Sequence, residues 1–330
     1  MAEPYLDRIA PSAADLSGEH VLVTGGSGLV GRHVVAGLTK AGAQVTVAAR
    51  TAGPGAAPGD VIGDLRDPAI RDAAVTEGLT AIVHLAAYTS VLGSLRDPAL
   101  VREVNVDVTA GLLELARQRG VGRFVLASTN VVTGDVGSSV IHEGLPLRPM
   151  TPYGATKAAA EMLLAGYAGG FGMTGCALRL TNVYGPGMAG HDSLVARLMR
   201  AVRDGTAIQV YGDGRQRRDL VHVDDVVAGL LVAWAAGHNG PLIIGAGRSV
   251  TVLDLIEATG RATGTPVRTE YVPAKPGEMP AVTVDIGLAR SLGYRPSVSL
   301  DEGLAGVWPD FRPPQPAAEA GRTGHTRDPR

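Results

Sequence analysis

The chain has 330 residues, of which 45% are hydrophobic and 19% charged, and its formal net charge is −2. This composition is typical of a globular protein, and a charge near zero argues against nucleic acid or an acidic membrane as a partner. The single cysteine, Cys176, excludes a disulfide framework and a cysteine-based zinc site. No apolar run approaches the roughly 18 residues of a membrane span. The N-terminal acids Glu3, Asp7 and Asp15 are unlike a secretory signal, so we expect a cytoplasmic protein.

Short apolar segments alternate with helical segments through the first half of the chain. After a polar N-terminal extension (residues 1–18), the pattern predicts strands at residues 21–23, 45–48, 81–85, 124–127 and 176–180. It predicts a glycine-rich turn and helix over 25–38, and further helices over 105–117 and 153–167. Such alternation is typical of crossover units in a parallel sheet that is covered on both faces. We therefore predict a doubly wound α/β (Rossmann) fold.

The alternation weakens after Asn182, which indicates a second, smaller substrate domain towards the C-terminus. We assign residues 19–182 and 220–247 to the Rossmann domain, and residues 183–219 and 248–312 to the substrate domain. Helices are predicted at 252–263 and 301–307. Residues 313–330 consist mainly of Pro, Ala, Gly and charged residues, so we expect a disordered tail.

A glycine-rich loop, Thr24-Gly25-Gly26-Ser27-Gly28-Leu29-Val30-Gly31, follows the first strand. In this arrangement Gly25 permits a turn, Gly28 lets backbone N–H groups approach a pyrophosphate, and Gly31 permits close helix–strand packing. A glycine triplet alone is weak evidence, but its position between strand and helix strengthens it. We predict dinucleotide binding by the six loop residues Gly25, Ser27, Gly28, Leu29, Val30 and Gly31.

The end of the second strand bears on the choice of dinucleotide. NAD enzymes usually place an acid there to accept from the ribose 2′-OH, whereas this strand ends Ala48-Ala49-Arg50. The Arg50 guanidinium suits a 2′-phosphate. NADP is therefore favoured over NAD, although a surface arginine beside an NAD site remains an alternative. Asp64 and Leu65, further along the chain, are expected beside the adenine.

Tyr153-Gly-Ala-Thr-Lys157 places a phenol and an ammonium group one helical turn apart. A neighbouring cation lowers the pKa of a phenol, which can then exchange a proton with a hydroxyl or carbonyl group while hydride moves to or from a nicotinamide. Thr129, at the end of the preceding strand, offers a hydroxyl to the same substrate oxygen. His84 and His222 have no metal-ligand spacing, so no metal is expected.

Taken in order, these motifs resemble the extended short-chain dehydrogenase/reductase family of nucleotide-sugar epimerases, dehydratases and ketoreductases. The resemblance runs from about Val21 to Trp308 and includes His84-Leu85-Ala86-Ala87, Asn105 and the segments 178–187 and 212–225. It implies that Thr129, Tyr153 and Lys157 are catalytic and that Lys157 also holds the nicotinamide ribose. It further implies cofactor contacts from Leu85, Ala86, Ala87 and Val183.

The same resemblance implies a set of substrate-binding residues and an oligomeric state. Asn182 and Arg218 would hold a diphosphate, with Arg295 as a second phosphate clamp and Tyr88 beside the sugar. Family members are often homodimers through two helices, here residues 105–117 and 153–167.

One departure from the family pattern narrows the reaction. Related 4,6-dehydratases carry Asp-Glu after the strand-end Thr, and related decarboxylases keep the Glu, whereas Asn130-Val131 stands here. An amide and an alkyl group cannot supply that acid–base pair. Dehydration and decarboxylation are therefore disfavoured, and reduction or epimerisation remains. Because Arg50 favours NADP, the sequence favours an NADPH-dependent 4-ketoreductase of a nucleoside diphosphate 4-keto-(deoxy)sugar. A nucleotide-sugar 4-epimerase with tightly bound NAD is the alternative.

Two further hypotheses about the function stay open. The first is a non-catalytic dinucleotide-sensing protein, which the intact Tyr153–Lys157 pair disfavours. The second is a ketone substrate without a nucleotide, such as a steroid or flavonoid, which Asn182 and Arg218 disfavour.

Overall fold

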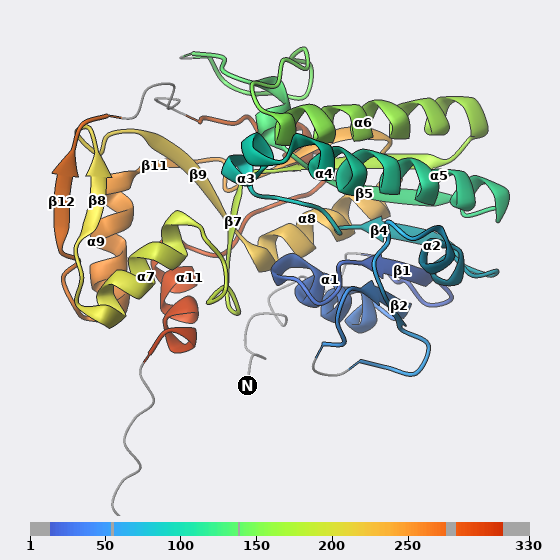
Figure 1. The fold of residues 1–330 in the computed structure, drawn as a ribbon, viewed down its shortest axis with the longest axis horizontal. Helices are drawn as coiled ribbons and strands as arrows, with labels where there is room; N and C mark the ends of the chain where they lie inside the picture. The colour runs from blue at the N-terminus through green and yellow to red at the C-terminus, as the bar shows by residue number, and fades with distance from the viewer. Residues whose placement is uncertain (1–13, 54–55, 138, 275–281, 313–330) are drawn as a thin grey trace, which may run out of the picture.

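The computed structural model describes residues 14–53, 56–137, 139–274 and 282–312. Its larger part is a parallel sheet with helices on both faces, and its smaller part carries two short sheets (Figure 1). The elements in chain order are β1 (His20–Thr24), α1 (Leu29–Lys40), β2 (Gln44–Ala49), β3 (Val61–Ile62), α2 (Pro68–Ala74), β4 (Ala81–His84), α3 (Val91–Arg96), α4 (Pro98–Arg102), η2 (Glu103–Asp107), α5 (Val108–Gln118), β5 (Arg123–Thr129), η3 (Asn130–Thr133), α6 (Pro152–Phe171), β6 (Thr174–Leu180), β7 (Asn182–Tyr184), α7 (Leu194–Asp204), β8 (Ile208–Tyr211), β9 (Arg217–His222), α8 (Val223–Ala235), β10 (Gly240–Ile244), β11 (Ser249–Thr251), α9 (Val252–Thr263), β12 (Thr269–Val272), α10 (Gly287–Ser291), α11 (Leu300–Val307) and η4 (Trp308–Asp310).

The main sheet has seven strands in the order β10-β6-β5-β4-β1-β2-β3. Every neighbouring pair in it is parallel. The strand order reverses between β1 and β4, and ligands of such sheets bind outside the carboxyl ends of the strands at this reversal. The predicted doubly wound fold is confirmed, and the glycine-rich loop follows β1 at the reversal.

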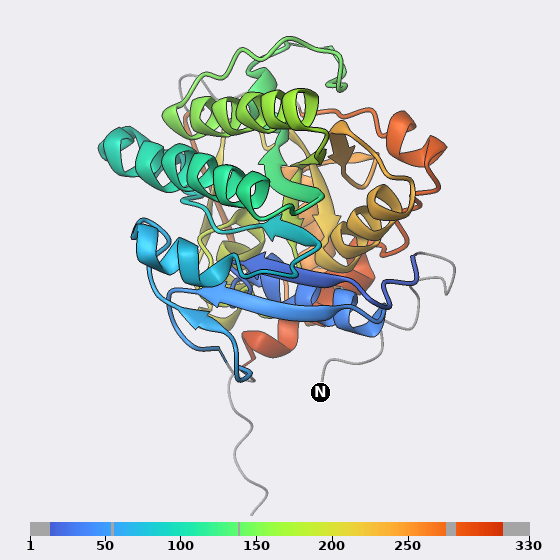
Figure 2. The ribbon, with the colours of Figure 1, turned by 90° about the vertical axis from the view of Figure 1, so that its right-hand side faces the viewer.

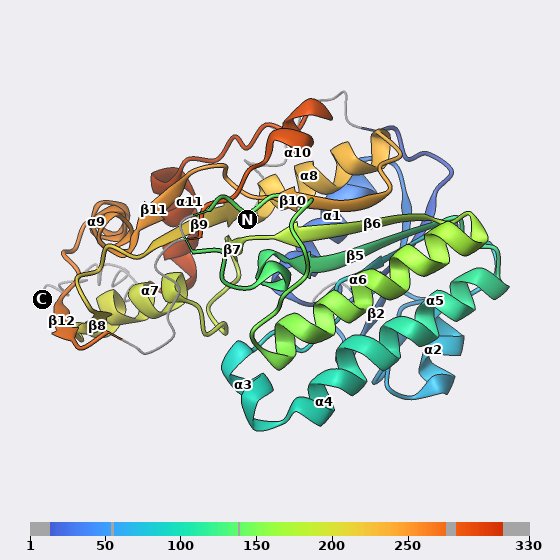
Figure 3. The same ribbon diagram turned by 90° about the horizontal axis from the view of Figure 1, so that it is seen from above.

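The strands are apolar on both faces because helices cover the sheet on both sides. Val21 and Val23 of β1 pack on the side of α1 and α8, whereas Leu22 between them packs on the side of α2, α5 and α6. Figures 2 and 3 show α5 and α6 side by side on one face of the sheet. The period-2 alternation of a buried strand thus divides the apolar residues between two cores.

The smaller part contains the antiparallel pair β11–β9, the parallel pair β9–β7 and the parallel pair β12–β8. A third apolar cluster joins α7, α9 and α11, and it includes Leu198, Leu255 and Leu304. Residues 282–294, which we expected in this domain, pack differently. Val284, Ala289 and Tyr294 join the core between the main sheet and α8. The assignment of residues 183–219 and 248–312 to one domain stays a prediction.

Several element boundaries differ from the sequence expectation. The helix expected at 105–117 begins earlier, at Pro98, and passes through a π-helical turn at Glu103–Asp107. The helix expected at 153–167 continues to Phe171 and ends at Gly172, whose φ of 71° suits a glycine. Within the expected N-terminal extension, Leu16 is buried and its N–H bonds to the Ala41 carbonyl at 2.8 Å. The tail 313–330 lies outside the described residues. In the described part of the chain, no helix combines the length and the hydropathy that a bilayer crossing requires.

The contact between α1 and α8 predicts how one glycine substitution affects stability. A Cβ added at Gly37 would lie 2.4 Å from Val227 Cγ1. We expect Gly37→Ala to lower the free energy of unfolding by about 1–2 kcal/mol in denaturant titrations, because overpacking outweighs the helix propensity of alanine. Gly166→Ala is the matched control: it adds a methyl group in open space within α6. It should raise the free energy of unfolding by about 0.5–1 kcal/mol. Equal effects of the two substitutions would contradict the close packing.

Candidate active site

The glycine-rich loop has a backbone shape that side chains would obstruct. Gly25 has a φ of 72°, and a Cβ there would lie 2.8 Å from the Ala86 backbone nitrogen. A Cβ at Gly31 would lie 2.1 Å from the Gly25 carbonyl oxygen. Gly28 is the N-cap of α1, and neither a capping side chain nor an acidic residue occupies the first turn. The loop therefore presents bare backbone at the positive end of a helix dipole.

A dinucleotide fits this cradle. The loop abuts the end of β4, where the Leu85 N–H donates to the Thr24 carbonyl at 3.2 Å. This places Leu85 and Ala86 beside the cradle, and the cofactor contacts of Leu85, Ala86 and Ala87 stay a prediction. Ser27 and Gly28 are exposed and Leu29 is buried. The loop thus offers N–H donors to a pyrophosphate, and the β4 end offers small apolar groups beside it.

Two arginines, Arg50 after β2 and Arg66 after β3, are in different states. Arg66 is paired: its guanidinium donates to Asp64 at 2.7 Å and lies 3.7 Å from Glu103. This pairing holds the pKa of Asp64 below its usual value, with a smaller contribution from Arg50. Arg50 is exposed, and within the described residues its side chain makes no hydrogen bond. Leu65 is buried beside them. Arg50 is therefore the cation available to a ligand.

The three expected catalytic residues come together at the carboxyl end of β5. Thr129 ends that strand, and Tyr153 and Lys157 lie one turn apart on α6, which packs against it. Thr129 and Tyr153 share a side-chain hydrogen bond. The Lys157 ammonium donates to the Ala127 carbonyl at 2.8 Å. All three side chains are buried.

Burial governs the protonation of this group. It raises the pKa of Tyr153 to about 12, and the hydrogen bond from Thr129 opposes it only in part. The expectation that Lys157 would lower this pKa is therefore wrong for the protein without ligand, because the ammonium is directed at Ala127. Burial also lowers the pKa of Lys157 to about 8, against an opposing effect of Glu161. Tyr153 is thus neutral at pH 7, and Lys157 loses its charge above about pH 8.

A buried hydrogen-bond chain, which sequence reasoning missed, joins the loop to the helices. The Ala86 N–H donates to Thr24 Oγ1 at 3.2 Å, and that hydroxyl bonds to His84 Nδ1 at 2.7 Å. His84 Nε2 bonds to Thr109 Oγ1 at 3.1 Å, and Thr109 donates to the Asn105 carbonyl at 2.7 Å. Burial, followed by the charge of Lys157, lowers the pKa of His84 to about 3. His84 is therefore neutral at physiological pH.

Asn105, in the π-helical turn, connects the expected sugar-binding Tyr88 to α6. Its Oδ1 accepts from the Tyr88 N–H at 2.8 Å, and its Nδ2 donates to the Tyr88 carbonyl at 3.1 Å. Nδ2 also donates to Thr156 Oγ1 at 3.0 Å, and Thr156 donates to the Tyr153 carbonyl at 2.8 Å. The backbones of Tyr88 and Tyr153 are thus held in one network. The π turn is the local signal, since such turns often mark functional positions.

The expected diphosphate residues lie on paired strands. Asn182 pairs with Leu220 in the register of β7 and β9, and its Nδ2 donates to the Asp219 carbonyl at 3.0 Å. Arg218 lies on the same strand β9, and Val183 follows Asn182 on β7. Arg295 follows α10. Its Nη1 donates to the carbonyl of Arg290 in the last turn of that helix and to the carbonyl of Tyr294, as basic side chains do at helix C-termini.

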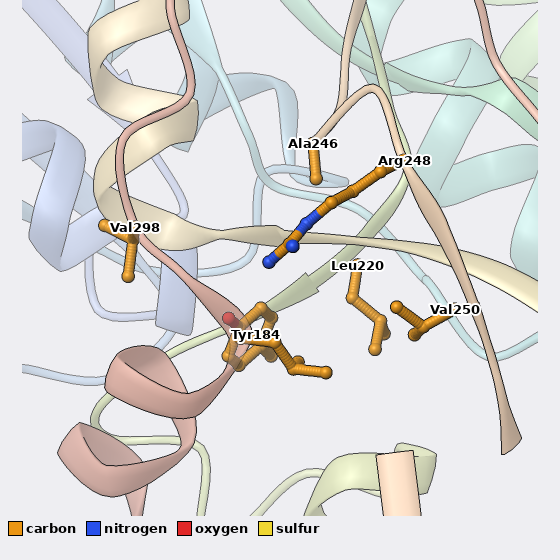
Figure 4. Close-up of a pocket in the computed structure, with 7 residues that line it drawn as sticks. Tyr184, Leu220, Ala246, Arg248, Val250 and Val298 are labelled. Carbon is orange, nitrogen blue, oxygen red and sulfur yellow. The ribbon is translucent and has the colours of Figure 1, made fainter. Parts of the chain in front are cut away.

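A small pocket lies beside these strands, and sequence reasoning did not find it. Figure 4 shows the Arg248 guanidinium reaching across it towards the Tyr184 ring, with Leu220 and Val250 along one side. Val250 pairs with Arg218 in the register of β11 and β9. The pocket therefore combines apolar walls with a cation next to the expected diphosphate residues. Its lining residues are Tyr184, Leu220, Ala246, Arg248, Val250, Val298 and Leu300.

Comparison with known proteins agrees with this geometry. Residues 21–245 match the model of the NAD dependent epimerase/dehydratase family. A dTDP-glucose 4,6-dehydratase from an Actinoplanes species is 34% identical over 86% of this chain and 95% of its own length. A UDP-glucose 4-epimerase from Streptomyces lividans is 34% identical over 86% and 92%. The solved UDP-glucose 4-epimerase of Thermus thermophilus, in complex with NAD, has a TM-score of 0.82 at 33% identity, covering 88% of this chain and 98% of that chain.

The fold and the site together define an oxidoreductase of the extended short-chain dehydrogenase/reductase class. The chain belongs to the NAD-dependent epimerase/dehydratase family, whose similar members act on nucleotide sugars. The similar solved structures whose names record a dinucleotide contain NAD, so the expected preference for NADP has no support from them.

Proposed function

We propose that this enzyme exchanges a hydride between NAD and C4 of a nucleoside diphosphate sugar, with 4-epimerisation as the net reaction. The observation that carries the proposal is the convergence of Thr129, Tyr153 and Lys157 next to a glycine cradle that fits a dinucleotide. The similarity to UDP-glucose 4-epimerases over most of the chain supports the same reaction.

The residues divide the proton chemistry between them. As the phenolate, the Tyr153 oxygen takes the proton of the C4 hydroxyl on oxidation, and as the resulting phenol it returns that proton to the C4 carbonyl oxygen on reduction. Thr129 bonds to the same substrate oxygen and orients it. When bound, the nicotinamide accepts and returns the hydride and in its oxidised form adds a positive charge. Lys157, while charged, adds to the positive potential that favours the phenolate.

The residues after Thr129 argue against dehydration. Asn130 and Val131 begin the short helix η3, and Asn130 is buried with its carbonyl bonded to Thr133. Elimination of water needs an acid and a base beside C5 and C6, and neither side chain can supply one. The similarity to dTDP-glucose 4,6-dehydratases therefore extends to the fold and to the first oxidation at C4, but not to elimination.

The substrate's diphosphate is proposed to lie against Asn182 and Arg218, between the main sheet and the smaller C-terminal part. Arg248 extends this positive surface from the adjacent pocket, because its guanidinium faces Tyr184 rather than a carboxylate. Arginine suits the position, since its planar fork matches phosphate oxygens. Arg295 uses only its Nη1 in hydrogen bonds to the carbonyl groups of Arg290 and Tyr294, and its role as a second phosphate clamp stays a prediction.

A 4-ketoreductase that uses NADPH is the second candidate, and Arg50 is the observation that favours it. No acid stands at the end of β2 to accept from a ribose 2′-OH, and Arg50 is free of hydrogen bonds within the described residues. Tyr153, neutral at pH 7, suits donation of a proton to a keto group. The two candidates differ in whether the dinucleotide stays bound between turnovers.

We further propose that the enzyme is a homodimer through α5 and α6. Met162 and Phe171 on α6 are each 60% exposed, and Phe171 carries the guanidinium of Arg117 from α5 over its ring at 5.2 Å. The proposal rests on the family resemblance, and a dimer through these helices would cover both apolar side chains.

Replacing the phenol tests the chemistry. We expect Tyr153→Phe to lower kcat by about 10²–10⁴-fold, because the proton exchange at the C4 oxygen is lost. Dinucleotide affinity, measured by calorimetry, should change little. Tyr167→Phe, on the same helix, is the control, since its hydroxyl bonds only to the surface Glu114 among the described residues. Full turnover in Tyr153→Phe would contradict the proposal.

The bound dinucleotide distinguishes the two candidates. We expect the purified enzyme to carry NAD, identified by mass spectrometry after extraction, because an epimerase regenerates its cofactor in each cycle. Conversion of UDP-glucose to UDP-galactose without added dinucleotide should accompany it. An empty site that prefers NADPH would instead establish the reductase.

Substitution of Arg50 tests quantitatively whether the enzyme binds NADP or NAD. If Arg50 binds a 2′-phosphate, Arg50→Ala should weaken NADPH binding about tenfold or more and leave NADH binding nearly unchanged. Arg66→Ala is the matched control, because that guanidinium is already bonded to Asp64. Equal losses for both dinucleotides would exclude the 2′-phosphate contact and favour the NAD-dependent epimerase.

A further inference from the structure

Glu161, Arg179 and Ser128 form a buried cluster between α6 and the strands β5 and β6. Arg179 Nη2 donates to Glu161 Oε2 at 2.7 Å, and Nε lies 3.1 Å from both carboxylate oxygens. The Ser128 hydroxyl donates to Glu161 Oε1. The Glu161 and Arg179 side chains are only 5% and 4% exposed. A carboxylate is thus held in the interior by three donor groups from two strands.

This cluster adjoins the proposed catalytic group on two sides. Glu161 lies one helical turn after Lys157 on α6. Ser128 lies between Ala127, whose carbonyl accepts from Lys157, and Thr129. Any change in the carboxylate therefore acts on both the charge near Lys157 and the end of β5.

Stability alone does not account for such a pair. Removing two charges from water costs free energy that their attraction repays only with good geometry, and apolar side chains of similar volume are often as stable or more so. Arg179 Nη1 also donates to the Glu143 carbonyl at 3.1 Å. The charged groups of the cluster therefore have hydrogen-bond partners in an interior where unpaired polar atoms cost free energy. Its location beside Lys157 points to an electrostatic role.

Among the groups around Lys157, Glu161 supplies the opposite charge. Tyr153 on the same helix is neutral at pH 7, and so is His84 on β4. Arg179 on β6 is directed at Glu161. Among the described residues, Glu161 is the only acid whose charge acts to keep Lys157 protonated against burial.

We propose that Glu161, held by Arg179 and Ser128, is a positioning residue that keeps the buried Lys157 in its charged form with its ammonium on the Ala127 carbonyl. The catalytic meaning of this role rests on the proposed function. The charge of Lys157 itself can be measured without any substrate.

The chain suits a direct measurement because its only lysines are Lys40, Lys157 and Lys275. With ¹³C-labelled lysine, the Cε signals of the full-length protein can be followed by NMR against pH and assigned with Lys40→Arg and Lys275→Arg. We expect Lys157 to titrate near pH 8 in the parent. In Glu161→Gln, which keeps the size of the side chain, the midpoint should fall by about one pH unit or more. An unchanged midpoint would overturn the proposal.

Two further variants separate charge from packing. Glu161→Gln leaves Arg179 buried without its partner, which is destabilising in itself. The double variant Glu161→Gln/Arg179→Met removes both charges and should recover thermal stability while the Lys157 midpoint stays below that of the parent. A return to the parent midpoint would show that the unpaired Arg179 caused the shift, and would refute the role of Glu161. Glu114→Gln, which removes a surface acid bonded to Arg117, should leave Lys157 unaffected.

Turnover provides the second readout. In Glu161→Gln the basic limb of the kcat profile should move to lower pH together with the Lys157 midpoint, while KM changes by less than about twofold. An equal loss of kcat at every pH would indicate a merely structural role and would overturn the proposal. If the parent converts no nucleotide sugar, the proposed function fails, and the titration of Lys157 still decides the role of Glu161.

Discussion

The active site depends on one unfavourable condition, a lysine ammonium that is buried in the protein interior. Water cannot solvate Lys157, so the protein must supply its hydrogen-bond acceptor and its counter-charge. The acceptor is the backbone carbonyl of Ala127 on β5. This hydrogen bond requires α6 to pack against that strand at one position along it. Tyr153 is on the same helix, so the placement of the lysine also determines where the phenol meets Thr129. The electrostatics of one side chain thereby set the geometry of the others.

The sequence predicted those parts of the site that are local in the chain. The glycine loop lies within one strand–turn–helix segment, and Tyr153 and Lys157 are one helical turn apart, so spacing alone brings their side chains to one face. The doubly wound sheet followed from the alternation of strands and helices. For Arg295 the spacing did not reveal that its Nη1 bonds to the carbonyl groups of Arg290 and Tyr294, and its phosphate contact stays a prediction.

Residues that are distant in the chain could not be found in this way. His84 meets Thr24 because β1 and β4 are neighbours in the sheet, and Glu161 meets Arg179 because α6 crosses β6. Arg248 enters its pocket through the antiparallel pairing of β11 with β9. Each contact follows from a strand order or register that spacing does not reveal. The pKa of Tyr153 was misjudged for a related reason, because burial is a property of the assembled fold.

The position of Arg50 separates two properties of the enzyme that are often treated together. Arg50 is exposed at the end of β2, next to the edge strand β3, whereas the proposed proton-transfer group is buried at β5 and α6. No described hydrogen bond links the two regions through Arg50. Selection could therefore exchange one dinucleotide for the other by altering a few surface residues, with no repacking of the core. In this fold the electron carrier and the proposed chemistry on the sugar are thus set by separate groups of residues.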